Sequence, residues 1–243
     1  MARNERVIVI AAMILLGAIA WLWTVAAAER AASPAMSGMA LAPPRFVVTF
    51  MMWWLMMVAM MLPPAAPAIL LYGRVRRQRG GDGLIAPTGV FLAGYLIAWA
   101  VISAVAGTVQ VLALGVGLLE PMAMRAASPL MAAATLIAAG VYQLLPVKDS
   151  CLTHCRSPAD FLSRHWRAGA TGALRLGLLH GAFCIGCCWL LMALLFVGGV
   201  MNLAWIASLS ILIAAEKLIP RGPVVARVVG AVLILWGTVR ILT

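Results

Sequence analysis

Charged side chains are scarce in this sequence. Only 10% of the 243 residues are Asp, Glu, Lys or Arg, whereas a water-soluble domain carries about a quarter. Hydrophobic residues make up 65% of the chain, which leaves too little polar surface to cover a soluble globule. The composition therefore excludes a soluble domain and predicts an integral membrane protein, so its formal net charge of +11 indicates membrane topology rather than binding to nucleic acid.

Acidic side chains are the scarcest, with seven Asp and Glu in total. None of them lies near the middle of a long apolar run, where proton-coupled pumps and di-iron proteins need carboxylates. The sequence also lacks a G-x-x-x-x-G-K-[ST] phosphate loop, an H-E-x-x-H pair and a C-x-x-C-H haem signature. These absences exclude an autonomous ATP-driven pump and a zinc protease, and we expect no enzymatic activity.

Long apolar runs dominate the rest of the chain. A membrane-spanning helix needs about 20 apolar residues, and seven runs reach or approach that length: 7–28, 47–72, 88–119, 128–146, 172–197, 200–219 and 224–242. The first run also resembles a signal peptide, but it is longer than the apolar region of such peptides, so we expect a retained span. The sequence predicts one all-α transmembrane domain over 1–243, a polytopic bundle of about seven spans with cytoplasmic loops near 73–87 and 147–171.

The distribution of basic residues gives this bundle an orientation. With the N-terminus in the cytoplasm, only Arg30, Arg45, Arg125 and Arg240 of the 18 Lys and Arg fall outside. Such an excess of positive charge on one side is typical of cytoplasmic loops. We therefore predict a multi-pass protein of the bacterial inner membrane, with its N-terminus in the cytoplasm and its C-terminus outside.

Methionine is concentrated in the second apolar run, which reads MMWWLMMVAMM over residues 51–61. On a helix, residues four apart stack, so one stripe holds Met52, Met56 and Met60 and a second holds Met57 and Met61. Thioether sulfur is a soft ligand that suits Cu(I). Methionine is also a flexible filler of helix interfaces, so the stripes are candidate copper ligands with a packing alternative.

Residues on either side of this methionine-rich segment extend the same idea. Met36 and Met39 precede it in a predicted outside loop, where they could gather ions. Pro63, Pro64 and Pro67 follow it and remove backbone donors, so we expect the second span to kink or break there. Broken membrane helices need protein or a cavity to satisfy the freed backbone groups. This segment is therefore predicted to face the protein interior.

Cysteine is concentrated in the fifth run, within HGAFCIGCCWLLM. Cys184, Cys187 and Cys188 occupy positions i, i+3 and i+4, and His180 lies four residues before Cys184, so all four share one helical face. Thiolate and imidazole together form a soft donor set for Cu(I) or Zn(II). A buried cysteine is ordinarily a small apolar residue, but three clustered beside a histidine favour a metal site.

The second and fifth spans are predicted to face each other. Both sulfur clusters fall near the middle of the membrane when residues are counted from opposite faces. Gly177 and Gly181 form a small-xxx-small pair that allows another helix to approach closely.

A third group, Cys151, His154 and Cys155, follows the fourth span on the predicted cytoplasmic side. Its C-x-x-x-C spacing is a weaker metal signal than paired C-x-x-C knuckles. A plain turn with incidental cysteines and a place where metal is taken up or released both remain open. The reducing cytosol disfavours a stable disulfide between the two cysteines.

Several motifs in fixed order carry a family resemblance: W-x-x-M-x-x-AMM-x-P, YQ-x-x-P-x-K-x-x-C-x-x-x-CRSP, C-x-GCCW-x-LM, GVMN-x-x-W and a late EK pair. Together they resemble a bacterial integral-membrane family of unknown function that is described as metal-binding and copper-chaperone-like. The resemblance covers about residues 45–240 and leaves the first span outside. It implies that the motif positions include Cys151, Cys155, Cys184, Cys187, Cys188, Met57, Met60 and Met61.

Three functions are compatible with these features. The leading hypothesis is a protein that binds Cu(I), with Zn(II) as the second metal, and passes the ion across the membrane or delivers it to a membrane cuproprotein. The second is a non-catalytic subunit of a larger membrane complex. The third is a thiol oxidoreductase that uses Cys184 and Cys187, although cysteines at i and i+3 of a regular helix hold their sulfurs poorly for a disulfide. We assign no chemistry to Glu216 and Lys217, which we expect to extend to the membrane interface, while Tyr142 and Gln143 are expected to bridge helices.

Overall fold

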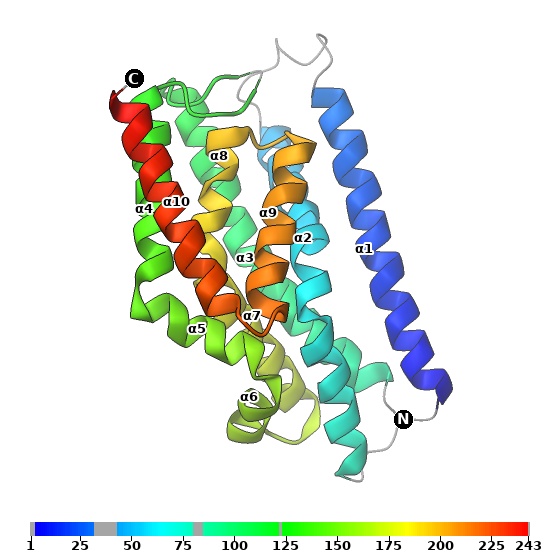
Figure 1. Ribbon diagram of the computed structural model, residues 1–243. Coiled ribbons are helices and arrows are strands. Elements are labelled where there is room, and N and C mark those ends of the chain that lie inside the picture. The colour runs from blue at the N-terminus through cyan, green and yellow to red at the C-terminus, as the bar shows by residue number, and fades with distance from the viewer. Residues whose placement is uncertain (1–2, 32–42, 80–84, 122, 243) are drawn as a thin grey trace.

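The computed structural model describes residues 3–31, 43–79, 85–121 and 123–242. Within these ranges the chain is helical, and the one β feature is an isolated bridge between Leu119 and Ala126. The elements in order are α1 (Arg3–Ala31), α2 (Pro43–Gln78), α3 (Ile85–Gly115), α4 (Pro129–Leu144), α5 (Pro146–Arg156), α6 (Pro158–His165), α7 (Gly169–Ala193), α8 (Leu195–Gly198), α9 (Leu203–Leu218) and α10 (Gly222–Leu242) (Figure 1). The all-α prediction is confirmed.

Each of the seven apolar runs forms a helix, but they differ in length. Among the described residues, five helices are long and apolar enough to cross a membrane: α1, α2, α3, α7 extended by α8, and α10. A sixth span is possible if α4 and α5, which meet at a bend of 66°, act as one broken span. The 16 residues of α9 extend about 24 Å, short of a hydrocarbon core of about 30 Å. The described helices thus support five to six spans, and the count of seven and the orientation of the termini stay predictions.

The connection predicted as a cytoplasmic loop at 147–171 is largely helical, because it contains α5 and α6. Pro146, which we expected to end the fourth span, is the first residue of α5. Proline suits this position, since the first turn of a helix leaves its N–H groups without intrahelical partners. Cys151, His154 and Cys155 therefore lie on a helix, which corrects the interpretation of this segment as a turn.

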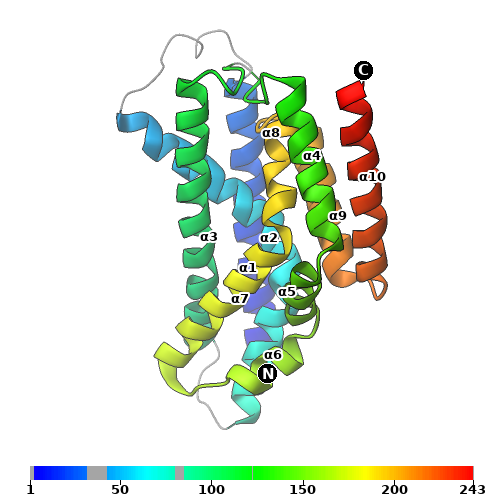
Figure 2. The same ribbon diagram turned by 90° about the vertical axis from the view of Figure 1, so that its left-hand side faces the viewer.

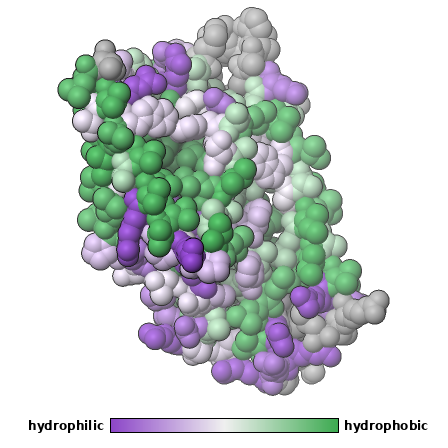
Figure 3. All heavy atoms as spheres, in the orientation of Figure 1, coloured by the Kyte–Doolittle hydropathy of each residue, from purple (hydrophilic) through white to green (hydrophobic). Residues whose placement is uncertain are grey.

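Apolar side chains cover much of the outer surface. Leu22, Leu112, Ile211 and Leu235 are each at least 64% exposed, as expected for helices that face lipid. Figure 3 shows hydrophobic residues over the middle of one face and hydrophilic residues gathered at its lower end. This distribution supports a multi-pass membrane protein.

Glycine lets α3 and α7 approach each other closely. A Cβ at Gly177 would lie 2.0 Å from the Phe91 carbonyl oxygen, and one at Gly181 would lie 2.5 Å from the Ala98 Cβ. Gly94 of α3 approaches α7 in the same way, 2.3 Å from the Leu174 carbonyl oxygen. Gly177 and Gly181 therefore do allow a close helix approach, and the helix that approaches is α3 rather than the second span.

Helix α2 continues through Pro63, Pro64 and Pro67 as one helix of 36 residues. The predicted break is absent, although the two halves of α2 run in different directions in Figure 2. The hydroxyl of Tyr95 on α3 donates to the carbonyl oxygen of Met61 at 2.9 Å, just before the prolines. This hydrogen bond joins α3 to α2 next to the prolines.

Candidate metal centre

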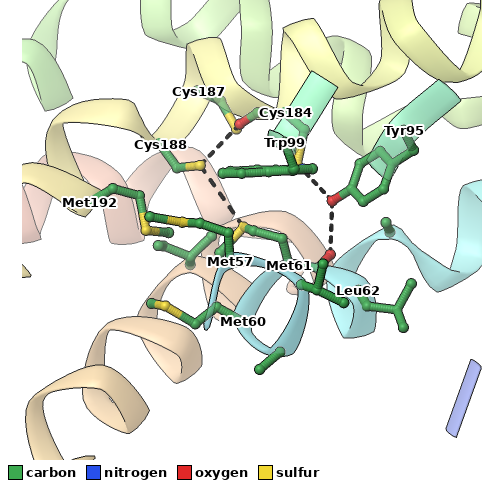
Figure 4. Close-up of a cluster of buried hydrophobic side chains, with 14 of the residues drawn as sticks. Met57, Met60, Met61, Leu62, Tyr95, Trp99, Cys184, Cys187, Cys188 and Met192 are labelled. Carbon is green, nitrogen blue, oxygen red and sulfur yellow. Dashed lines mark hydrogen bonds between the residues drawn. The ribbon is translucent and has the colours of Figure 1, made fainter. Parts of the chain in front are cut away.

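The sulfur atoms of α7 lie inside the bundle. Cys184, Cys187 and Cys188 are each no more than 2% exposed, and Met61 of α2 is fully buried. All four belong to the main hydrophobic cluster, part of which is drawn in Figure 4. Their burial follows from the position of α7, which packs closely on α3 and is in contact with α5.

Met61 and Cys188 form the first sulfur pair, with 4.0 Å between the Met61 Sδ and the Cys188 Sγ (Figure 4). A metal-bound thiolate lies about 2.3 Å from a zinc ion, so two sulfurs that share an ion of similar size stand at most about 4.6 Å apart. The observed spacing fits a shared ion. The long methionine side chain bridges α2 and α7, so the two predicted sulfur clusters do meet.

Cys155 and Cys187 form a second pair, whose Sγ atoms are also 4.0 Å apart. This pair joins α5 to α7, where the lack of a side chain at Gly186 lets α5 approach. A Cβ at Gly186 would lie 2.9 Å from the Cys151 Sγ. The structure therefore brings Cys155 to a cysteine of α7, while Cys151 rests against the glycine beside it.

The three cysteines of α7 do not converge on one point. The thiols of Cys187 and Cys188 both donate to the Cys184 carbonyl oxygen, at 3.1 and 3.0 Å. Among the described residues, no group of three or more His, Cys, Asp or Glu is arranged to hold a metal ion. The three cysteines share one helical face and lie close together, but they do not form a single coordination sphere. The thiols of Cys187 and Cys188 instead form hydrogen bonds with the backbone of their own helix.

The remaining predicted methionines are buried in the same hydrophobic cluster. They are Met52, Met56, Met57 and Met60, of which Met52 is the most exposed at 8%. Of the predicted stripes, Met61 is the member that the structure brings to a cysteine. The predicted ion-gathering residues Met36 and Met39 lie outside the described residues.

His180 occupies an aromatic pocket. Its ring centroid lies 5.5 Å from that of Phe161, 5.8 Å from that of Tyr95 and 6.1 Å from that of Phe91. Within the described part of the chain, its buried Nδ1 has no hydrogen-bond partner. The Nδ1 atom therefore has a lone pair or a proton that no described protein group uses. His180 lies one turn before Cys184 on α7.

His154 lies apart from the sulfur pairs. Its ring stacks on Phe183 with centroids 4.2 Å apart, and its Nδ1 is 2.8 Å from the Ser150 carbonyl oxygen. These contacts hold the imidazole to its own helix and to an aromatic face, and they account for His154 as a packing residue of α5.

Lys217 is the residue that sequence reasoning missed. We expected its side chain at the membrane interface, but it is only 6% exposed and its Nζ lies 2.9 Å from the Cys184 Sγ and 3.7 Å from the Met61 Sδ. A buried ammonium requires a compensating charge, and the nearest group that can supply it is the Cys184 sulfur as a thiolate. The thiolate is also the form of cysteine that binds metals.

Glu216, the residue before Lys217, faces a different side of α9. Its carboxylate accepts hydrogen bonds from the Lys148 Nζ and the Gln143 Nε2, both at 2.6 Å. Arg156 adds a hydrogen bond from its Nη1 to the Glu216 carbonyl oxygen at 3.1 Å. This network fixes the end of α9 against α4 and α5, which confirms the expectation that Gln143 bridges helices and corrects the one for Glu216.

Tyr95 also lies beside the Cys184 sulfur. Its hydroxyl oxygen lies 3.3 Å from the Cys184 Sγ, in addition to its bond to the Met61 carbonyl (Figure 4). One sequence signal could have found it, since a tyrosine hydroxyl in the middle of an apolar run needs a buried partner.

Comparison with known families gives one result. The family model of the PpoB2 copper chaperones matches residues 50–240, which include both sulfur pairs and Lys217. Comparison with curated proteins gives no match. Comparison with solved structures gives none either.

Proposed function

The chain belongs to the PpoB2 copper chaperone family, and on this premise we propose that it carries Cu(I) on buried sulfur ligands and delivers the ion to a membrane cuproprotein. The observation that carries this proposal is the contact between the Met61 Sδ and the Cys188 Sγ at 4.0 Å, beside the Cys184 sulfur, which contacts the same Lys217 ammonium as Met61. Two thiols and a thioether form a soft set of ligands, which is the kind that selects Cu(I).

The arrangement favours Cu(I) over Zn(II). Structural zinc sites are tetrahedral and take four nitrogen, sulfur or oxygen ligands. In the described residues the sulfurs occur as pairs, with no convergence of three His, Cys, Asp or Glu side chains. An ion that accepts few, soft ligands including a thioether fits these pairs better than zinc does.

We propose that the two sulfur pairs act as successive stations for the ion. Cys187 and Cys188 are adjacent on α7, and their Sγ atoms lie 4.0 Å from the Cys155 Sγ and the Met61 Sδ respectively. An ion held by Met61, Cys184 and Cys188 can therefore pass to Cys187 and Cys155, because Cys187 and Cys188 neighbour each other in sequence. Met36 and Met39 would gather ions before the first station, and Cys151 lies beside the second, against Gly186.

We propose that this transfer takes place in the bacterial inner membrane. Transfer is passive and non-enzymatic, since the sequence carries no phosphate loop and no carboxylate near the middle of its apolar runs. The partner is a membrane cuproprotein that accepts the ion.

Elemental analysis tests the proposal. Protein purified without oxygen, loaded with Cu(I) and desalted should retain copper, and a variant with Cys184, Cys187 and Cys188 all changed to Ser should lose it. X-ray absorption at the copper edge should report sulfur ligands in the wild type. The matched control is Met13→Leu, which alters a buried methionine of α1 outside these pairs. Equal, negligible copper in wild type and triple variant would contradict the proposal and favour the structural subunit.

A thiol oxidoreductase is the second candidate, and the 4.0 Å spacing of Cys155 and Cys187 is the observation that favours it. These sulfurs belong to different helices, so they are better placed for a disulfide than Cys184 and Cys187. A disulfide between Cys155 and Cys187, detected by mass spectrometry after mild oxidation of protein that binds no copper, would support this function. Copper binding that protects both thiols from alkylation would argue for the copper carrier.

A further inference from the structure

The ammonium of Lys217 lies where a bound cation would be expected. Its Nζ is in contact with the Cys184 Sγ at 2.9 Å and with the Met61 Sδ at 3.7 Å. These two sulfurs come from α7 and α2, so the lysine of α9 bridges the same helices that a copper ion would bridge. An ion held by both sulfurs needs the space that the ammonium fills.

We propose that Lys217 is a resident competitor of Cu(I), which occupies the sulfur ligands of the copper-free protein and lowers its affinity for the ion. This inference rests on the proposed copper-carrying function and adds a means of release to it. A carrier must give up its cargo, and a built-in cation that returns to the sulfurs assists departure of the ion.

In the copper-free state the Cys184 sulfur already has a cationic partner. A thiolate without a counter-charge is costly inside a membrane protein, and the ammonium at 2.9 Å removes that cost. Copper must therefore replace an interaction that already exists, rather than fill an empty site. Breaking the lysine–sulfur interaction costs free energy, so the observed affinity for Cu(I) is lower than it would be at an empty site.

The exchange needs no redox partner. The hydrogen bond from the Lys217 Nζ to the Cys184 Sγ breaks, the bond from Cys184 to Cu(I) forms, and the ammonium keeps its proton. The flexible four-carbon stem of lysine allows the charge to move off the sulfur without movement of α9. Copper stays in the +1 state throughout.

The groups around Lys217 indicate that a soft cation can replace its ammonium at the sulfurs. Lys217 meets a single thiolate and a thioether, whereas the other buried lysine, Lys148, meets the carboxylate of Glu216. Sulfur is a weaker hydrogen-bond acceptor than a carboxylate oxygen. A soft cation can therefore displace the ammonium from sulfur, while hard cations gain too little to do so.

Competition for Cu(I) against a chromophoric Cu(I) chelator tests this proposal. Lys217→Leu removes both the charge and the hydrogen-bond donor, whereas Lys217→Gln removes the charge but keeps a donor. If one of the two variants folds poorly, the other serves for the test. We expect both to bind Cu(I) at least tenfold more tightly than the wild type and to release it more slowly to the chelator. The control Arg227→Leu removes a positive charge from an exposed site on α10 and should leave affinity unchanged.

The outcomes separate the two proposals. If the wild type binds no copper, the proposed function fails. If the wild type binds copper on its cysteines but the Lys217 variants bind it equally well or more weakly, the function stands and the competitor is overturned. Weaker binding would make Lys217 a counter-ion of the loaded site.

Discussion

Glu216 and Lys217 are neighbours in α9, yet they are buried in two regions of opposite character. Glu216 faces α4 and α5, where Lys148 and Gln143 saturate its carboxylate with hydrogen bonds of 2.6 Å. Lys217 faces α2 and α7, where its ammonium meets sulfur. The first region pairs a hard carboxylate with hard nitrogen donors, and the second pairs a hard cation with soft ligands.

The difference between these regions assigns them different roles. A closed carboxylate–lysine network holds helices in register, and removal of one partner leaves a buried charge unpaired. A lysine–sulfur contact leaves ligands that prefer another cation. Two adjacent residues of α9 therefore have different roles: Glu216 belongs to a structural clamp, its network with Lys148 and Gln143, and Lys217 to a site where one cation can replace another.

The strongest test of this contrast breaks the clamp. Lys148→Met leaves the Glu216 carboxylate without its cation, and loss of one partner of a buried pair costs about 3–5 kcal/mol. Unfolding in detergent should show this loss, while Cu(I) affinity of the folded protein stays near that of the wild type. The double variant Lys148→Met with Glu216→Gln should recover much of the stability. A double variant as unstable as the single one would show that the pairing is not the cause.

The next effect comes from the scaffold that presents Cys184. Gly177→Val places a side chain against the Phe91 carbonyl, where even a Cβ would lie 2.0 Å away. We expect α3 and α7 to separate at a cost of about 1–3 kcal/mol, the usual range for overpacking, with weaker copper binding because Tyr95 and Cys184 shift apart. Gly89→Ala on α3, whose Cβ has open space, is the control. Unchanged unfolding of Gly177→Val would contradict the close packing.

A smaller effect is expected from a substitution that removes the sulfur of Met61 but keeps its volume. Met61→Leu keeps an apolar side chain of similar volume and removes the thioether, so stability should change by less than about 1.5 kcal/mol. Copper affinity should fall about tenfold, which corresponds to about 1.4 kcal/mol. Met13→Leu on α1, a buried methionine away from the cysteines, should leave affinity unchanged. Equal affinities for the two variants would remove Met61 from the ligands.

The smallest effect concerns the second station. Cys155→Ser should abolish any copper held between Cys155 and Cys187 and leave the ion at Cys188 and Met61 in place. Elemental analysis should then show a reduced copper-to-protein ratio without complete loss. Thr153→Ala, an exposed neighbour on α5, is the control. Complete loss of copper from Cys155→Ser would show that the two pairs form one site.

The sequence predicted the helices and the sulfur chemistry better than the contacts between them. Apolar runs of about 20 residues located every long helix, and sulfur clustering identified α2 and α7 as the source of ligands. Periodicity could not say which helix the Gly177 face meets, because small residues permit close approach by any partner. It likewise placed Cys184, Cys187 and Cys188 on one face but could not say that two thiols turn toward the Cys184 carbonyl.

Lys217 shows why part of the site was missed. A lysine near the end of an apolar run ordinarily extends to the interface, and this sequence offers no local sign of the opposite choice. The deciding groups, Cys184 and Met61, are distant in sequence and come together only through tertiary packing. Glu216 was misjudged for the same reason, since Lys148 and Gln143 lie on other helices.

The short length of α9 has a consequence for the lipid around it. A helix of 16 residues is about 6 Å shorter than the hydrocarbon core of an average bilayer, and α4 has the same length. Bilayers adjust to such hydrophobic mismatch by thinning beside the short helices. If α4 and α9 each cross the bilayer, the lipid beside them is expected to be compressed, so the stability of the protein should depend on acyl-chain length.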